Sequence, residues 1–350
     1  MAYSTIPKPS VYFNTKLYTG NSSTNAITGV GFQPDWVWMK NRGATDSHYL
    51  YNAVRGVTKN VYSNLTNAEA TKSNGLTAFG TDGFTLGNEG DINGNGNNFV
   101  SWNWKCETGV SGTTTGSGSS RSYSGRVNTT AGISIINYAG NSTSGHTIPH
   151  NLGAVPKIVM LKNLGDTGDW IVHMGALNDP EKVTSLNTTA AATNFNAGFN
   201  TTTPTSSVFT LGNSVAVNDD NQQYIAYSFA EKKGYSKFGS YTGNASTDGT
   251  FVYTGFKPAF VIIKSSSQAE TNWVVVDNKR EGYNPDNDRL FPDSTQAEST
   301  SDVVDLVSNG FKLRSGAGSS NATYSYIYMA FAEEPLVANS GTDGVPATAR

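Results

Sequence analysis

The hydrophobic positions of the chain fall into short segments with the pattern of β-strands. Apolar and polar residues alternate, or apolar residues run for four to eight positions, and Gly, Asn, Asp and Pro bound the segments. The segments are rich in Val, Ile, Tyr, Phe and Trp, which strands favour. Stretches with a helical period are short, at 67–72, 190–192 and 302–306, and none reaches the ~12–15 residues that an isolated helix needs. The pattern predicts an all-β protein.

The strand-like segments recur in one order three times along the chain. Each copy has Tyr-x-Gly-Asn, a strand with a proline and a lysine six residues apart, an aromatic residue, Phe-x-Leu and an aromatic-rich closing strand. A repeat of this kind indicates that one structural unit is built three times. In chain order the landmarks are Tyr18, Lys40, Tyr49, Phe84 and 99–104; Tyr138, Lys162, Trp170, Phe209 and 224–229; and Tyr241, Lys264, Trp273, Phe311 and 326–331.

The repeat predicts three tandem β-sandwich modules, jelly-roll-like and of about 100 residues each. A segment rich in Gly, Ser and Thr separates the first two copies and is interpreted as a linker. The short join at 231–236 favours close packing of the last two modules. A string of modules and a pseudo-threefold cluster both remain open. The predicted parts are an N-terminal attachment segment (1–10), module 1 (11–107), the linker (108–131), module 2 (132–233), module 3 (236–335) and a C-terminal tail (336–350).

Composition narrows the class of protein. Charged residues make up 15% of the 350 residues, against a usual ~25%. The net charge of −3 and the pI of about 5.8 argue against nucleic-acid binding. The sequence contains neither a long apolar run nor a signal-peptide core, so we expect no membrane span and no secretion signal. The single cysteine, Cys106, excludes a disulfide framework and a cysteine-based zinc site.

The residues that recur at the proline–lysine strand are interpreted as structural. One face of this strand carries a large side chain in every copy, which is typical of core packing, with sugar stacking as the alternative. The lysine at the end of the strand is interpreted as a structural cap or a surface charge rather than a catalytic amine. The face residues are Trp36, Trp38, Ile158, Met160, Phe260 and Ile262, and the lysines are Lys40, Lys162 and Lys264.

The sequence gives little sign of a catalytic site. Glycoside hydrolysis needs two carboxylates that face one cleft, and the carboxylates of this chain are dispersed. Glu69 and Glu298 occupy equivalent positions, where the middle copy has Ala190-Ala191, and we interpret them as structural. The sequence has no P-loop and no Gly-x-Ser-x-Gly that opens a helix. We therefore expect a protein that is not an enzyme and needs no cofactor.

One segment resembles half of a calcium-binding loop. Asp91, Asn93 and Asn95, followed by Gly96, match the first positions of such a loop, but Trp102 stands where a bidentate glutamate is needed. The alternative is a hairpin, because Asn-Gly favours tight turns between strands. We expect no resident metal, with calcium at these three residues as the weaker alternative.

Exposed aromatic rings are the other candidate chemistry. A flat ring can cover the CH face of a pyranose, so aromatic residues in polar surroundings are candidates for glycan contacts. Equally, they can be core residues of alternating strands. The candidates are Tyr49, Tyr51, Trp170 and Trp273.

The first copy resembles a family of tail-fibre-like and minor structural proteins in the virions of marine bacteriophages of the cyanophage type. The resemblance is close over about 12–105 and loose in the other two copies. Asn52 stands where the family often has Asp, and no catalytic residue is carried over. The segments that carry the resemblance are 31–42 (GFQPDWVWMKNR), 50–56 (LYNAVRG), 63–71 (SNLTNAEAT) and 82–87 (DGFTLG).

The resemblance implies a non-catalytic virion protein of the tail-fibre, receptor-binding or capsid-decoration type. Such a protein would be assembled in the cytoplasm of a host bacterium, would contact other virion proteins and would form a homo-oligomer. A homotrimer is expected by analogy with phage fibres. Two alternatives stay open: a carbohydrate-binding module for host adhesion, which would bind a cell-surface glycan, and a polysaccharide depolymerase.

Overall fold

The computed structural model describes residues 4–280, 284, 288–301 and 303–336. It confirms the all-β class, since nearly all its regular structure is antiparallel strand. Within the described residues, no helix is long and apolar enough to cross a membrane. The helical turns are η1 (Pro9–Val11), α1 (Gly90–Asn93), η2 (Gly175–Leu177), α2 (Asn196–Phe199) and α3 (Val215–Asn218).

The first pair of sheets is built from the N-terminal third of the chain. A six-stranded sheet has the order β1-β9-β3-β4-β5-β6, and a three-stranded sheet has the order β2-β8-β7. The strands are β1 (Phe13–Thr19), β2 (Asn25–Thr28), β3 (Trp36–Asn41), β4 (Tyr49–Asn52), β5 (Lys59–Tyr62), β6 (Ala70–Thr71), β7 (Leu76–Gly80), β8 (Gly83–Leu86) and β9 (Asn98–Trp104).

The second pair combines an eight-stranded sheet, β10-β12-β13-β20-β15-β16-β17-β18, with a three-stranded sheet, β11-β14-β19. Its strands are β10 (Thr108–Thr113), β11 (Thr115–Gly116), β12 (Ser122–Asn128), β13 (Ile133–Ala139), β14 (His146–Pro149), β15 (Ile158–Asn163), β16 (Ile171–Met174), β17 (Lys182–Ser185), β18 (Thr193–Asn194), β19 (Val208–Leu211) and β20 (Gln223–Phe229).

The predicted linker at 108–131 is wrong. This segment forms β10, β11 and β12, and β10 pairs with β12 along its whole length. Gly, Ser and Thr dominate its composition, but Tyr123 and Val127 alternate with polar neighbours and point into hydrophobic clusters. Composition concealed this period-two pattern, which is the stronger signal for a strand.

The third pair has a four-stranded sheet, β21-β27-β23-β24, and a three-stranded sheet, β22-β26-β25. Its strands are β21 (Ser236–Thr242), β22 (Phe251–Tyr253), β23 (Phe256–Ser265), β24 (Val274–Asp277), β25 (Val304–Val307), β26 (Gly310–Leu313) and β27 (Ser325–Pro335). The order β1-β9-β3-β4 of the first large sheet therefore recurs as β13-β20-β15-β16 and as β21-β27-β23-β24.

The three large sheets face one another around a shared core. Each is also covered on its outer face by its own small sheet, so its central strands are buried on both sides and read as continuous apolar runs. The predicted core face of the proline–lysine strand is confirmed, because all six residues lie in this shared core. Its large members include Trp36, Trp38, Trp102, Trp104, Ile158, Met160, Trp170, Tyr227, Phe260, Ile262, Trp273 and Phe331.

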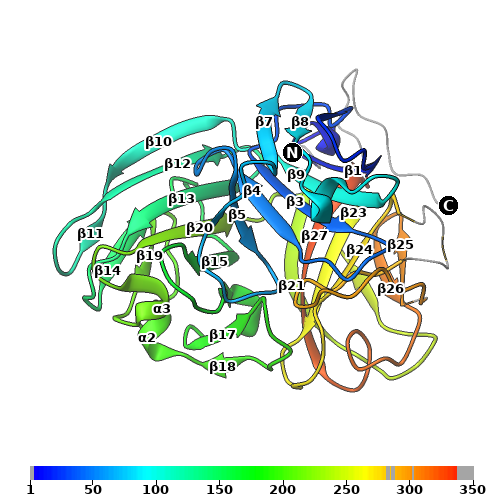
Figure 1. The fold of residues 1–350 in the computed structure, drawn as a ribbon. Coiled ribbons are helices and arrows are strands. Elements are labelled where there is room, and N and C mark those ends of the chain that lie inside the picture. Colours follow the sequence, from blue (N-terminus) through cyan, green and yellow to red (C-terminus); the bar gives the residue numbers. More distant parts are fainter. Residues whose placement is uncertain (1–3, 281–283, 285–287, 302, 337–350) are drawn as a thin grey trace.

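Aromatic contacts join the three sheet pairs at the centre. Trp36 stacks on Trp104, with ring centroids 4.2 Å apart, and lies 4.6 Å from Tyr227 of the second pair. Trp104 in turn lies 5.7 Å from both Phe260 and Phe331 of the third pair. The arrangement is therefore a cluster around one centre rather than a string, and Figure 1 shows the three bodies side by side.

The N-terminal segment packs on the rest of the chain where it is described. Ser4 and Ile6 are buried, and Ile6 belongs to the shared core. Residues 1–3 of the predicted attachment segment lie outside the described residues. The same holds for 337–350 of the predicted C-terminal tail.

Candidate functional sites at the seams between sheet pairs

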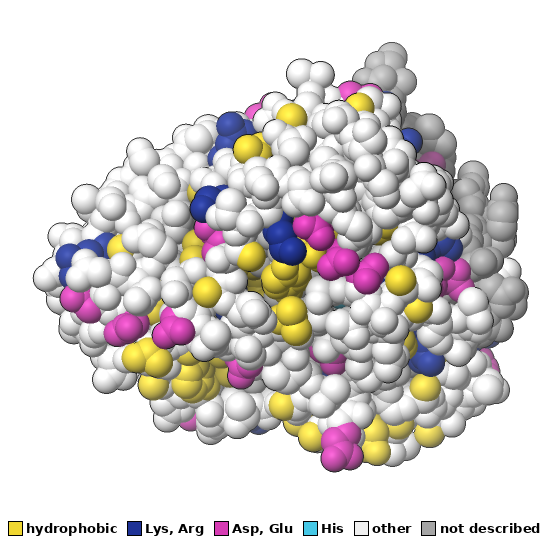
Figure 2. All heavy atoms as spheres, in the orientation of Figure 1, with side chains coloured by type: hydrophobic (Ala, Val, Ile, Leu, Met, Phe, Trp, Pro, Cys, Tyr) yellow, Lys and Arg dark blue, Asp and Glu magenta, His cyan; other side chains and the backbone are white. Residues whose placement is uncertain are grey.

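On the face shown in Figure 2, charged side chains of both signs and small groups of hydrophobic side chains are scattered among backbone and uncharged side chains. The three sheet pairs meet along three seams, which we call seam 1–2, seam 2–3 and seam 3–1. Residues that recur in the sequence lie at these seams, where they join one sheet pair to the next.

The recurring lysines are buried in the structure. Lys162 donates from Nζ to the carbonyl oxygens of Thr66 and Gly168, both at 2.9 Å, so it crosses seam 1–2. Lys264 donates to Thr189 at 3.1 Å across seam 2–3. Lys40 donates to local carbonyl oxygens at 2.8 Å. Burial lowers the pKa of each lysine to about 8.

Backbone hydrogen bonds link the sheet pairs in a closed cycle. The N–H of Glu69 donates to Leu164 across seam 1–2 at 3.0 Å, and the N–H of Ala192 donates to Ser266 across seam 2–3 at 2.9 Å. The third bond, from Glu298 to Arg42 at 2.8 Å, closes seam 3–1. The three acceptors each follow a recurring lysine by two residues. The contacts therefore repeat around a pseudo-threefold axis.

Trp170 and Trp273 are part of the same cycle. Both indoles are buried, with exposed fractions of 0% and 4%. Trp170 donates from Nε1 to the carbonyl oxygen of Tyr62 at 2.8 Å, and Trp273 donates to that of Ser185 at 2.9 Å. The prediction that these rings are glycan contacts is corrected, because the rings are enclosed between sheet pairs and fix the seams.

The equivalent residue in the first copy is His48, not Tyr49. The backbone N–H of Trp170 donates to the side chain of Asn187, and that of Trp273 donates to Asp293. In the first copy the backbone N–H of His48 donates to Asn64 in the same way, at 3.0 Å. Burial lowers the pKa of His48 well below its ordinary value.

Tyr49 and Tyr51 are also buried, in the cluster between the two sheets of the first pair. The Tyr49 hydroxyl donates to the Asp91 carboxylate at 2.8 Å. Burial raises the pKa of both phenols above the ordinary value. Neither ring can stack on a sugar at the surface, so this part of the glycan prediction is corrected as well.

The replacement Asp293→Asn tests the seam capping. Burial raises the pKa of Asp293 to about 7, while an unfolded Asp titrates near ~3.9. The folded chain therefore retains a proton that the unfolded chain loses, and this costs stability progressively as pH rises from about 4 to about 7. Asn64 and Asn187 accept the equivalent bond without this cost.

We expect Asp293→Asn to be more stable than the parent, and we expect the difference in the free energy of unfolding to grow by roughly 1–3 kcal/mol from pH 5 to pH 8. Urea unfolding at the two pH values measures the difference. The matched control, Asn64→Asp, should change stability in the opposite direction. A difference that does not vary with pH would contradict the prediction.

The calcium-loop alternative does not fit the geometry. Asp91 lies in α1 and accepts a hydrogen bond from the Tyr49 hydroxyl, and the backbone N–H of Asn95 donates to Ser22 Oγ at 2.8 Å. The predicted hairpin is absent too, because the flanking strands β8 and β9 belong to different sheets. Within the described residues, no group of three or more His, Cys, Asp or Glu side chains could hold a metal.

Asn93, the remaining calcium candidate, has a structural role. Its side-chain oxygen accepts the backbone N–H of Asn21 at 3.0 Å, and its amide donates to the carbonyl oxygens of Ser23 and Gly87, both at 2.7 Å. Asn218 and Asn321 accept the backbone N–H of Asn141 and Asn244 in the other two copies. The buried asparagine therefore fixes the Tyr-x-Gly-Asn loop three times.

The other residues of Tyr-x-Gly-Asn have matching roles. Tyr18 donates from its hydroxyl to the carbonyl oxygen of Ile92, directly before the buried asparagine, and Tyr138 and Tyr241 make the equivalent bonds. A Cβ on Gly20 would lie 2.2 Å from the carbonyl oxygen of Gly94. The sequence showed the motif but not its partner, because each buried asparagine stands alone, shortly before the closing strand.

Two of the three seams contain an arginine–glutamate pair. At seam 1–2, Arg55 contacts Glu69 at 3.0 Å. At seam 3–1, Glu298 binds Arg280 at 2.9 Å and Arg42 at 2.6 Å. The structural role inferred for Glu69 and Glu298 agrees with these contacts.

Seam 2–3 lacks the pair. Leu177 is the equivalent of Arg55 and Arg280, since each lies three residues after the last residue of β4, β16 or β24. Ala192 is the equivalent of Glu69 and Glu298, as the cycle of backbone hydrogen bonds shows. The groove at this seam has a volume of about 580 Å³, against about 360 Å³ at seam 1–2 and about 400 Å³ at seam 3–1.

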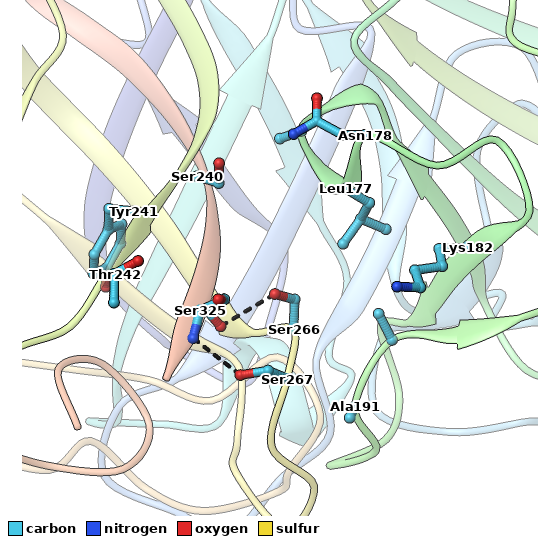
Figure 3. Close-up of a pocket in the computed structure, with 12 residues that line it drawn as sticks. Leu177, Asn178, Lys182, Ala191, Ser240, Tyr241, Thr242, Ser266, Ser267 and Ser325 are labelled. Carbon is cyan, nitrogen blue, oxygen red and sulfur yellow. Dashed lines mark hydrogen bonds between the residues drawn. The ribbon is translucent and has the colours of Figure 1, made fainter. Parts of the chain in front are cut away.

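The groove at seam 2–3 has two chemically different walls, which Figure 3 shows. The wall from the second sheet pair presents small apolar side chains and Lys182, and that from the third presents serine hydroxyls. Ser266 donates from Oγ to the carbonyl oxygen of Ser325 at 3.1 Å, and Ser267 Oγ accepts the Ser325 N–H at 2.9 Å. The lining residues are Ala176, Leu177, Asn178, Lys182, Ala191, Ala192, Ser240, Tyr241, Thr242, Ser266, Ser267 and Ser325.

The fold and its seams define a class: an all-β protein whose three pairs of sheets surround one shared core. The chain matches a family model described as a domain of unknown function, DUF7483, over residues 8–335, and it belongs to that family. One model therefore spans all three sheet pairs. A comparison with curated proteins gave no match. A comparison with solved structures gave none either.

Proposed function

We propose that the chain is a non-catalytic structural protein of a bacteriophage particle, of the tail-fibre, receptor-binding or capsid-decoration type. The observation that carries the proposal is the role of the recurring residues. The lysines, the tyrosine–glycine–asparagine loops and the seam contacts all hold the three sheet pairs together. A repeat that serves a rigid scaffold suits a particle component, and the segments that resemble virion proteins supply the context.

Hydrolysis of a polysaccharide is disfavoured by the state of the two recurring glutamates. Burial raises the pKa of Glu298, but the hydrogen bonds and charges of Arg42 and Arg280 outweigh it and leave this pKa below the ordinary value. Glu298 therefore stays ionised and cannot serve as the general acid that glycoside hydrolysis needs. Glu69 is paired with Arg55 at a different seam.

The closed cycle also bears on assembly. Three sheet pairs within one chain already give pseudo-threefold symmetry, which a homotrimer of single sandwiches would otherwise provide. The homotrimer stays a prediction, as do contacts with other virion proteins and a virion location.

Immunogold labelling of intact phage particles tests the proposal. Antibodies raised against the full recombinant chain should label the tail or the capsid at fixed positions in electron micrographs. Particles incubated with antibodies that had been absorbed with the same chain provide the control. The proposal would be contradicted if the antibodies detected the protein in the soluble fraction of the lysate but never labelled particles.

A further inference from the structure

We propose that the groove at seam 2–3 binds an anionic oligosaccharide of the hexuronate type. The inference goes beyond the proposed particle role and does not rest on it. The inference starts from the internal repeat, because at the other two seams an arginine–glutamate pair occupies the equivalent positions. Seam 2–3 alone has lost both members of the filling pair.

The loss has opened space without breaking the seam. The backbone bond from Ala192 to Ser266 and the side-chain bonds of Lys264 and Trp273 are all present. The groove has a volume of about 580 Å³, which exceeds the volumes of about 360 Å³ and about 400 Å³ at the two seams that keep the pair. The missing side chains are thus unnecessary for holding the sheet pairs together, and their absence leaves a site.

The two walls match the two surfaces of a sugar. Leu177, Ala191 and Ala192 form an apolar strip that suits the CH groups of a pyranose. Opposite them, the hydroxyls of Ser240, Ser266 and other serines offer donors and acceptors for sugar hydroxyls. In Figure 3, Leu177 and Lys182 lie across the groove from Ser266 and Ser267.

Lys182 selects for negative charge. Its equivalent in the first pair is Lys59, since each begins the strand after the Arg55 or Leu177 position. Lys59 lies 3.9 Å from Glu69. In the second pair, Ala192 occupies the position equivalent to Glu69, so Lys182 has no glutamate there. Lys182 is the charged residue of the groove, whose described lining contains no Asp or Glu, and in Figure 3 its side chain extends toward the serines. A hexuronate carboxylate beside Lys182 would provide a counter-charge in place of the glutamate.

Calorimetry of the full-length recombinant protein tests the proposal, with tetragalacturonate as the probe and maltotetraose as a neutral tetramer of equal length. We expect saturable binding of tetragalacturonate, at least roughly tenfold tighter than that of maltotetraose, because a charge-assisted hydrogen bond is worth about that factor. Lys182→Gln should abolish this preference. Lys59→Gln is the matched control and should leave binding within about twofold of the parent.

A second variant fills the groove. Leu177→Arg with Ala192→Glu rebuilds the pair found at the other seams and should abolish binding. Because Leu177 packs against the shared core, Ser240→Trp serves as an independent blocking variant at an exposed wall position. Three results would each overturn the proposal: no saturable binding of tetragalacturonate by the parent, equal affinity for the neutral tetramer, or equal effects of Lys182→Gln and Lys59→Gln.

Discussion

Replacing Trp104 by alanine is expected to destabilise all three sheet pairs together, by about 3–5 kcal/mol, the cost of truncating a large buried aromatic side chain. Trp104 is fully buried in the shared core. Its ring contacts Trp36 in the first pair and Phe260 and Phe331 in the third. A cavity at this point removes packing from more than one sheet pair, so the pairs should unfold as one unit.

Hydrogen exchange with mass spectrometry measures this effect separately for peptides of each sheet pair, alongside urea unfolding of the whole chain. Exchange should accelerate in all three. Val215→Ala is the control, since this side chain is 65% exposed on α3 and should change stability by less than ~0.5 kcal/mol. Accelerated exchange confined to the first pair would show that the pairs are independent and would contradict the prediction.

Replacing Arg280 by methionine is expected to cost about 3–5 kcal/mol, because it leaves the buried Asp277 carboxylate without its ionic partner and removes one of the two arginines that bind Glu298. The Arg280 side chain is fully buried. It binds Asp277 at 2.7 Å and Glu298 at 2.9 Å, and it donates to the carbonyl oxygen of Val275 at 2.9 Å. Asp277 also accepts the indole N–H of Trp102 at 2.9 Å, so the network joins the first and third pairs.

Urea unfolding at pH 7 measures the loss for Arg280→Met. The neighbouring Lys279→Met is a suitable control, since the side chain of Lys279 is 44% exposed and its ion pair should contribute less than ~1 kcal/mol. The triple change Arg280→Met, Asp277→Asn and Glu298→Gln should recover part of the loss, because no charge then stays buried alone. Equal effects of Arg280→Met and Lys279→Met would refute the role given to the network.

The sequence predicted the strands well because the central strands are buried on both faces and therefore appear as short apolar runs. The pattern at the proline–lysine strand identified its core face, as Trp36 and Phe260 show. The sequence could not predict that the three sheet pairs form a closed cycle. The hydrogen bonds that close it join backbone groups, which are the same whatever the side chain. Glu298 donates to Arg42 through its N–H, and any residue except proline could do so.

The candidate site was missed for a related reason. Aromatic residues with polar neighbours in the sequence suggested glycan contacts. The indoles of Trp170 and Trp273 instead donate hydrogen bonds across the seams between sheet pairs. The informative signal was an absence within the repeat. Alanine in the middle copy, at the position of Glu69 and Glu298, marks the seam that has opened. Such an absence gains meaning only when the structure shows what the glutamates bind.

The bond from Glu298 to Arg42 also has a consequence for how such a chain can change in evolution. Open solenoids lengthen by adding units at an end, because each unit contacts only its neighbours. Here the last unit is joined to the first, so a fourth copy could enter only by breaking the seam that closes the cycle. The number of units is therefore fixed at three, and diversification is directed to the side chains that fill or leave open each seam.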